Sequence, residues 1–255
     1  FLILFQQTLQ NGLITSFVGA IEQQSAPVLV YSVDGRRNLQ GSVITPALEE
    51  QIRGVDGVGA AGLIGQGTFS VTAAGELTSA AVIGYSDPDL GAPDSMVSGR
   101  LPESTGEVVA IDSAASDGFD VGDTVTVEPG GLDLEAEGLA ERIGYQASTT
   151  LFTTYATYEA AVGAANPDAG GVLPAVMALT PADGITAEEL VGRVNDAVPE
   201  ADALTRADAA AETPGVAQVR QSFQVIFLLY GLVIPLITGL FFLIITLQKA
   251  NSLTL

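Results

Sequence analysis

The sequence contains no cysteine, no histidine and no tryptophan, and Lys249 is its single lysine. Without cysteine there is no disulfide and no thiolate metal site. Without cysteine and histidine, Ser-His-Asp and Cys-His nucleophiles are excluded, as are zinc sites of the usual kind. A Ser-Lys dyad would depend on Lys249, which directly follows a long apolar run. We therefore predict no catalytic, cofactor-binding or metal-binding residue, and expect that the chain is not an enzyme.

Basic residues are scarce as a class. Thirty acidic residues oppose nine basic ones, and the formal net charge is −21. A surface with this charge repels nucleic-acid phosphates and anionic lipid head groups. The composition therefore excludes a nucleic-acid-binding role and indicates an exposed, soluble acidic domain.

Charge is absent from one long segment near the C-terminus, between Arg220 and Lys249. Val225 to Leu247 would form a helix about 35 Å long, enough to cross a hydrocarbon core of about 30 Å. A buried core helix is the alternative, but such helices are rarely apolar on every face. Pro235 and Gly239, which membrane helices tolerate, lie inside the segment, and Pro235 is expected to bend it. We predict a transmembrane span here.

The same helix is expected to begin before the membrane. Thr213 fits an N-cap and Pro214 the first helical position. The segment that follows, including Arg220, would then stand outside the bilayer as a stalk.

The N-terminal segment has a related pattern. The run "FLILF" fits the end of an earlier span, and apolar residues then recur at helical spacing up to Ile21, among them Leu13 and Phe17. This pattern predicts a first stalk over 6–24. A cleaved signal peptide is the competing interpretation, but no basic segment precedes "FLILF".

Between the stalks lies a polar domain with alternating signals. A strand is expected over 28–33, a helix between Thr45 and Gly54, and an antiparallel pair that turns at Ala74-Gly75. Short strands follow in "GEVVAID", "VGDTVTVEPG" and "ERIGYQAS". Next come a helix ending at Asn166-Pro167, a strand in "GVLPAVMALT" and a helix with a Thr186 capping box. The pattern predicts an α+β fold with a β-rich insert.

Residues 57–62 spell G-x-G-x-x-G, the spacing of a dinucleotide-binding turn. That turn must follow a strand and open a helix, because the helix N-terminus holds the pyrophosphate. Here the glycines follow an expected helix and precede an expected strand. We therefore predict a turn and no cofactor.

Carboxylates gather in two places. They are Asp87, Asp89 and Asp94, and then Asp112, Asp117, Asp120 and Asp123. Calcium takes such oxygen ligands, but neither group matches an EF-hand loop, and aspartate beside glycine and proline typically forms turns. Paired carboxylates for glycoside hydrolysis remain an open alternative.

The order of these features resembles that of FtsX/MacB-type ABC transporter permeases, with their MacB-like periplasmic core domain. The similarity rests on "APVLVYS", "DPDLGAPDSMVSGRLP", "GEVVAIDSAASDGFDVGDTVTV" and "VLPAVMALTPADGITAEELVGRV", followed by a membrane helix ending in "LQKANSLTL". The run from Gly99 to Val127 is the part most like the family.

The resemblance implies a porter-like αβ domain with a β-rich insert, flanked by two long membrane and stalk helices. The implied divisions are 1–25 (end of the first span and stalk), 26–93 and 166–212 (porter-like part), 94–165 (insert), 213–249 (stalk and second span) and 250–255 (start of a cytoplasmic segment). It further implies two later spans and an ATPase-facing segment that includes Lys249 and Asn251.

The resemblance also implies partners and a location. They are an ABC-type ATPase on a separate subunit or domain, a second permease copy in a homo- or heterodimer, and an extracytoplasmic protein partner. The chain would be a multi-pass protein of the bacterial cell (inner) membrane with a large extracytoplasmic domain, moved by the ATPase for export, extraction or partner activation. The alternative is a membrane-anchored extracytoplasmic binding or scaffold protein without an ATPase.

Overall fold

The computed structural model describes residues 24–141, 148–214 and 216–252, together with Thr8, Gly12, Gly19 and Ile21; of residues 217–220 and 247–252 it describes the backbone. The strands are β1 Val28–Ser32, β2 Val58–Ala73, β3 Glu76–Tyr85, β4 Met96–Gly99, β5 Glu107–Ile111, β6 Thr124–Glu128, β7 Leu132–Ala140, β8 Thr149–Thr154, β9 Val176–Pro181 and β10 Ala201–Thr205. The helices are η1 Val33–Gly35, α2 Pro46–Arg53, α3 Pro88–Gly91, η2 Asp112–Asp117, α4 Tyr155–Ala165, α5 Ala187–Ala197, α6 Arg206–Glu212 and α7 Val216–Ser252. These elements confirm a mixed α and β fold.

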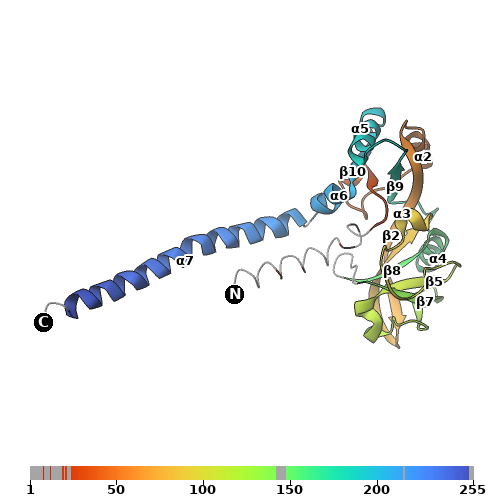
Figure 1. The fold of residues 1–255 in the computed structure, drawn as a ribbon. Helices are drawn as coiled ribbons and strands as arrows, with labels where there is room; N and C mark the ends of the chain where they lie inside the picture. The colour runs from red at the N-terminus through yellow and green to blue at the C-terminus, as the bar shows by residue number, and fades with distance from the viewer. Residues whose placement is uncertain are drawn as a thin grey trace.

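One part of the domain is an antiparallel sheet in the order β10-β1-β9-β2, covered by helices (Figure 1). Alternate residues of a strand point to opposite faces. Val28 and Val30 of β1 are buried in one cluster with residues of α2 and α5. Leu29 and Tyr31 belong to the main core cluster, which also contains Ile21 and residues of α6 and α7. Ile21, α6 and the start of α7 therefore pack on the face opposite to α2 and α5.

The other part is a closed ring of strands. β2 pairs with β3, β3 with β8, β8 with β5, β5 with β7, β7 with β6, and β6 returns to β2. The long strand β2 joins the two parts, because its first half pairs with β9 and its second half with β6. Closure removes the exposed edges that an open sheet would present. The predicted domain boundaries between 93 and 94 and between 165 and 166 stay predictions. The ring combines β2 and β3, which precede the first boundary, with β5, β6, β7 and β8, which follow it.

Several local predictions are confirmed. The side chain of Thr45 accepts a hydrogen bond from the Leu48 N–H at the start of α2, and Thr186 and Glu189 form the capping box of α5. Ala74 and Gly75 form the β2–β3 turn with positive φ angles of 48° and 82°. The six-residue glycine stretch follows α2 and opens β2, so it is a turn and the start of a strand.

Two predictions need correction or extension. The C-terminal helix begins at Val216, not at Pro214, and the Thr213 hydroxyl donates back to the Ala209 carbonyl of α6 at 2.7 Å. The alternating run "LDLEAEGLA" forms β7, which the sequence reasoning missed. The strand expected in "ERIGYQAS" falls largely on 142–147, outside the described residues.

Helix α7 leaves the domain next to α6 and extends far from it (Figure 1). Its 37 residues correspond to about 55 Å. At the other end of the chain, Thr8, Gly12, Gly19 and Ile21 are helical, and Gly19 and Ile21 are buried. The other residues of the predicted first stalk, Leu13 and Phe17 included, lie outside the described residues.

Candidate functional site

The candidate site is the junction where α7 and the N-terminal segment meet the domain. Helix α6 packs against β1, β10 and α7. At its first residue, the Arg206 Nη1 donates a hydrogen bond to the Gln24 carbonyl and lies 3.8 Å from Asp94 Oδ2. The Arg206 N–H donates to the Pro27 carbonyl at 2.9 Å. Three segments that are far apart in the sequence therefore meet at the start of α6.

The last residue of α6, Glu212, is held by a second arginine. Arg37, in the loop after β1, forms an ion pair with Glu212 and donates two hydrogen bonds to Asp202, of 2.7 and 3.3 Å. The hydrogen bonds to Asp202 raise the pKa of Arg37. Arg36 and Arg37 both have left-handed backbone conformations, with φ of 48° and 60°. Residues other than glycine keep this conformation where surrounding contacts hold it.

The junction also has an apolar layer. Ile21, Ala209, Ala210 and Val216 are each at most 3 % exposed and belong to the core cluster that includes Tyr31. Each therefore lies inside the domain rather than on its surface. The start of α7 is thus part of the domain core, although the rest of the helix is not.

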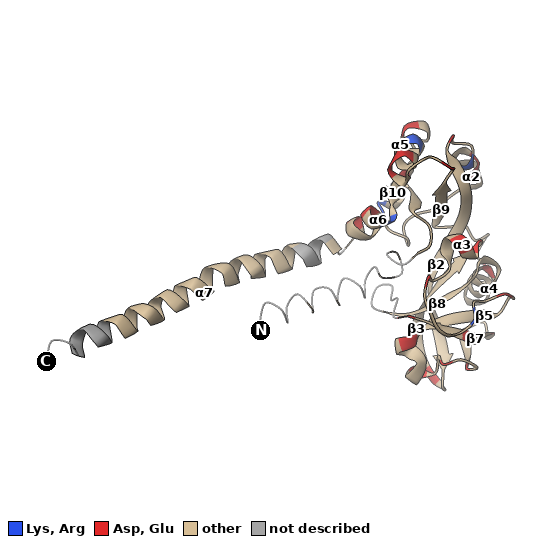
Figure 2. Ribbon diagram, in the orientation of Figure 1, with Lys and Arg blue, Asp and Glu red and all other residues tan. Residues whose placement is uncertain are grey.

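Beyond the junction, α7 carries one candidate membrane span, Gln221–Thr246, with a mean hydropathy of 2.6 and no buried part. Length and composition alone support this assignment. The span is drawn without any charged residue in Figure 2. Val225 is 65 % exposed, and a Cβ built at Gly239 would meet nothing within 4 Å. The helix continues through Pro235, so the expected bend there stays a prediction.

The other residues predicted to have a role lie near the C-terminus. Pro214 lies in the connection between α6 and α7 and is exposed. Arg220, Leu247, Lys249 and Asn251 lie within α7, but their side chains are outside the described part of the chain. The roles predicted for them, as stalk, end of the span and ATPase-facing segment, stay predictions.

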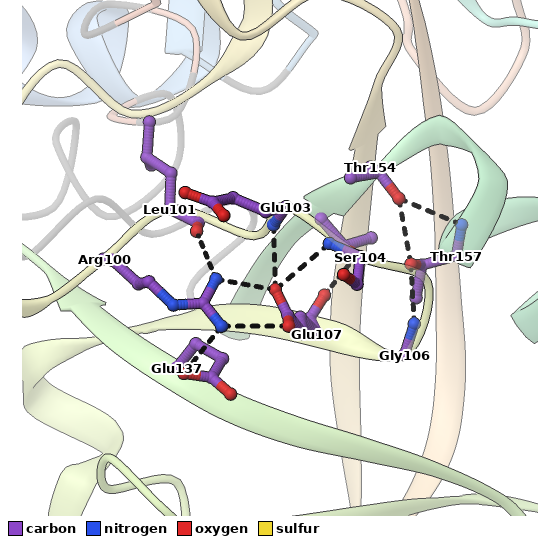
Figure 3. A network of polar contacts seen from close by, with 10 residues as sticks. Arg100, Leu101, Glu103, Ser104, Gly106, Glu107, Glu137, Thr154 and Thr157 are labelled. Carbon is purple, nitrogen blue, oxygen red and sulfur yellow. Dashed lines mark hydrogen bonds and ion pairs between the residues drawn. The ribbon is translucent and has the colours of Figure 1, made fainter.

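The family-like run that begins at Gly99 forms a charged clamp in the ring of strands (Figure 3). Arg100 donates two hydrogen bonds to the Glu107 carboxylate, of 2.8 and 2.9 Å, and lies 3.2 Å from Glu137 Oε2. Glu107 Oε2 also accepts from the backbone N–H groups of Glu103 and Ser104. These bonds hold the loop between β4 and β5 against β7.

The contacts of the clamp shift the pKa values of Glu107 and Arg100. The pKa of Glu107 is lowered to about 2, first by the hydrogen bond from Arg100 and next by the N–H of Glu103, against an opposing effect of burial. The pKa of Arg100 is raised, first by the same bond to Glu107. Charge-assisted, bidentate pairs of this kind are the strong ones among protein hydrogen bonds. The contacts of Arg100 and Glu107 therefore give this part of the run a structural role.

Threonines continue the network toward α4. Thr153 donates to the Glu107 carbonyl at 2.6 Å, and Thr157 accepts from the Gly106 N–H at 3.0 Å. Thr154 caps α4 by accepting from the Thr157 N–H. Figure 3 shows Thr154 and Thr157 beside Gly106, in the turn before β5. The start of α4 is thereby tied to the clamp.

An open hollow of about 600 Å³ lies beside this network, in the size range of small-molecule sites. Its walls include Pro102, Glu103, Thr154, Tyr155 and Glu159. Burial raises the pKa of Tyr155, and the nearby Glu159 carboxylate raises it further. The hollow therefore has an acidic, partly aromatic lining.

Three carboxylates of the two sequence groups, those of Asp87, Asp120 and Asp123, accept hydrogen bonds from nearby backbone N–H groups, whereas Asp94 pairs with Arg206 at the junction. Asp87 Oδ1 accepts from the Asp89 N–H at 3.0 Å at the start of α3. Asp123 Oδ2 accepts from the Asp120 N–H, and Asp120 Oδ1 from the Val121 N–H, each at 2.8 Å. Among the described residues, no three or more acidic side chains gather closely enough to hold a metal ion. Asp87, Asp120 and Asp123 form turns and caps.

Comparison with solved structures places this architecture among known ones. The chain is similar to the periplasmic region of MacB from Actinobacillus actinomycetemcomitans, with a TM-score of 0.51 and 13 % identity over 72 % of this chain and 92 % of that one. It is also similar to the extracellular domain of the noncanonic ABC-type transporter YknZ from Gram-positive bacteria, with a TM-score of 0.47 and 12 % identity over 70 % and 99 %. No protein-family model matches the chain, and no curated protein matches its sequence. The resemblance predicted from the sequence is therefore confirmed for the fold, which is that of the MacB periplasmic region.

Proposed function

We propose that the chain is the permease subunit of an ABC transporter of the FtsX/MacB type. It passes motion driven by an ATPase to its outer domain, for export, extraction or activation of an extracytoplasmic partner. The observation that carries this proposal is a MacB-like domain attached, through a buried junction, to a candidate membrane span. A fold is shared by unrelated functions, so the junction is the feature that favours mechanical coupling.

The proposal includes partners and a location. An ABC-type ATPase and a second permease copy, identical or different, complete the transporter in the bacterial cell membrane. The acidic domain lies outside the cytoplasm, and the stalk segments connect it to the spans. The chain itself hydrolyses nothing, and its motion follows from ATP binding by the partner.

The first test is purification of the full-length protein from its own membranes in mild detergent, with mass spectrometry of the proteins that accompany it. We expect an ABC-type ATPase in stoichiometric amount. Its reproducible absence, with the chain intact, would contradict the proposal. It would favour the alternative, a membrane-anchored binding protein that uses the acidic hollow at Glu103 and Glu159 to hold a partner.

The second test joins the stalks covalently. Because the chain has no cysteine, an introduced cysteine pair gives a single defined cross-link. Cross-linking the stalks is expected to abolish the ATP-dependent function while the domain stays folded. Full function in the cross-linked protein would contradict mechanical transmission, and the reduced protein is the control.

A further inference from the structure

The N-terminal segment is attached to the loop after α3 at two neighbouring residues, Gln24 and Ser25. Gln24 pairs with Pro93 in an isolated antiparallel β-bridge, and the Ser25 hydroxyl donates to the Ala92 carbonyl at 3.2 Å. The side chain of Gln24 is buried, and its Oε1 has no hydrogen-bond partner among the residues that the structure describes. The backbone at Gln24, rather than its amide oxygen, therefore fastens the end of this segment.

Arg206 fastens the same point from the other side. Its guanidinium donates to the Gln24 carbonyl and lies near Asp94, which directly follows the bridge residue Pro93. A guanidinium is planar and always charged, so one side chain can serve a carbonyl and a carboxylate together. Arg206 thus connects α6 to both strands of the bridge.

The far end of α6 leads directly into α7. Only residues 213–215 separate Glu212 from Val216, and the Val216 N–H donates to the Thr213 carbonyl at 3.1 Å. Thr213 in turn donates to Ala209 within α6, and Arg37 holds Glu212. A helix of seven residues is a short, stiff body of about 10 Å. One end of α6 therefore holds the first stalk segment, and the other end holds α7.

We infer that Arg206 is a positioning residue that couples the two stalks through α6, so that they move as one unit. The coupling role rests on the proposed function. The geometry assigns it to Arg206 because that side chain joins residues 182 positions apart at the point where the N-terminal segment enters the domain. Without this contact, the bridge at Gln24 would hold the segment to the loop after α3, and α6 would keep the backbone bond to Pro27 and the apolar contacts of the core cluster, but no side-chain bond to Gln24.

The test uses the full chain in lipid nanodiscs, with spin labels at Thr8→Cys and Gln221→Cys, one on each stalk. The distance distribution between the labels is measured without nucleotide, and then with the ATPase and a non-hydrolysable ATP analogue. We expect the Arg206→Ala variant to broaden the distribution at least twofold without nucleotide. We also expect it to lose the shift of the distribution that the analogue produces in the parent chain.

Arg193→Ala is the matched control, because Arg193 is also a partly exposed arginine in an ion pair, with Asp56, on α5 away from the stalks. It should leave both measurements unchanged. Arg206→Lys, which keeps the charge and N–H donors on a compact ammonium in place of the planar guanidinium, should restore most of the narrow distribution. If Arg206→Ala does not fold, Arg206→Gln, which keeps an N–H donor without the charge, replaces it with the same expected broadening.

The outcomes separate the two proposals. Equal widths in Arg206→Ala and the parent chain would overturn the inference. Broadening in Arg206→Ala, together with a parent chain whose distances never respond to nucleotide, would support the coupling of the stalks and contradict the proposed function. Broadening together with a lost nucleotide response would support both.

Discussion

Two arginine-centred networks lie in different parts of this molecule, and they differ in what they join. In the Arg100 clamp the Glu107 carboxylate accepts four hydrogen bonds from residues no more than seven positions away, and the ion pair from Arg100 to Glu137 ties this loop to the adjacent strand β7. At the junction, Arg206 and Arg37 connect residues 182 and 165 positions apart. The clamp therefore shapes one loop in the ring of strands, whereas the junction determines how separate segments pack on the domain.

From this difference we infer that arginine–carboxylate contacts stabilise the fold at the clamp, whereas at the junction they position separate segments. The clamp lies against buried strands of the ring and is linked to α4 through threonines. The arginines of the two networks are similarly exposed, 43 % for Arg100 and 38 % for Arg37 and Arg206. Their partners differ, because the Glu107 side chain is 15 % exposed whereas that of Asp94 is 45 % exposed, and exposed ion pairs contribute little to stability. Disturbing the clamp should therefore lower the free energy of unfolding more than disturbing the junction, which should leave the domain folded but uncoupled.

The largest effect is expected at Gly99, which begins the clamp. Its φ is 71°, and a Cβ there would lie 2.1 Å from the Glu137 carbonyl oxygen. Gly99→Ala should lower the free energy of unfolding by about 3 kcal/mol, through left-handed strain and overpacking. Gly122→Ala is the control, because its φ is 91° with nothing within 4 Å, and it should cost about 1 kcal/mol. Thermal unfolding in mild detergent measures both, and equal losses would exclude the contact with Glu137 as the cause.

A smaller, pH-dependent effect is expected from Glu107→Gln. The folded pKa of Glu107, about 2, lies below its ordinary value of 4.5, so its ionised form stabilises the fold above pH 4.5. That contribution is lost as the pH falls from 4.5 through about 2. The variant should be less stable at pH 7, and its difference from the parent should shrink toward pH 2. A difference that stays constant from pH 6 to 2 in acid unfolding curves would contradict the role of this ionisation.

The smallest effect is expected from Asp94→Asn at the junction. The pair between Asp94 and Arg206 is long, at 3.8 Å, and the Asp94 side chain is 45 % exposed. The free energy of unfolding should change by no more than about 0.5 kcal/mol. Thermal unfolding beside the parent chain measures this. A loss above about 1 kcal/mol would show that the junction, like the clamp, contributes to stability, and the comparison drawn above would fail.

Much of the fold could be predicted from local sequence signals. The caps at Thr45 and Thr186, the turn at Ala74-Gly75 and the end of α4 at Asn166 depend on a few neighbouring residues, so they could be read from the sequence. The start of α7 was placed two residues too early, because Thr213 and Pro214 lie in the connection after α6, where the Thr213 hydroxyl donates to the Ala209 carbonyl. Strand β7 was missed although Leu132, Leu134 and Ala136 alternate with acidic residues, the period of a half-buried strand.

By itself, the sequence determined the acidic surface, the apolar run of α7, the local caps and turns, and an order of features that resembles a family. Each depends on composition or on spacings within one or two turns of chain. Only the tertiary structure decided that β6 closes a ring with β2, and that β2 runs through both parts of the domain. It alone brought Arg206 to Gln24 and Arg37 to Glu212, because contacts between distant residues depend on how whole elements pack, and no local pattern records which partner each arginine will meet.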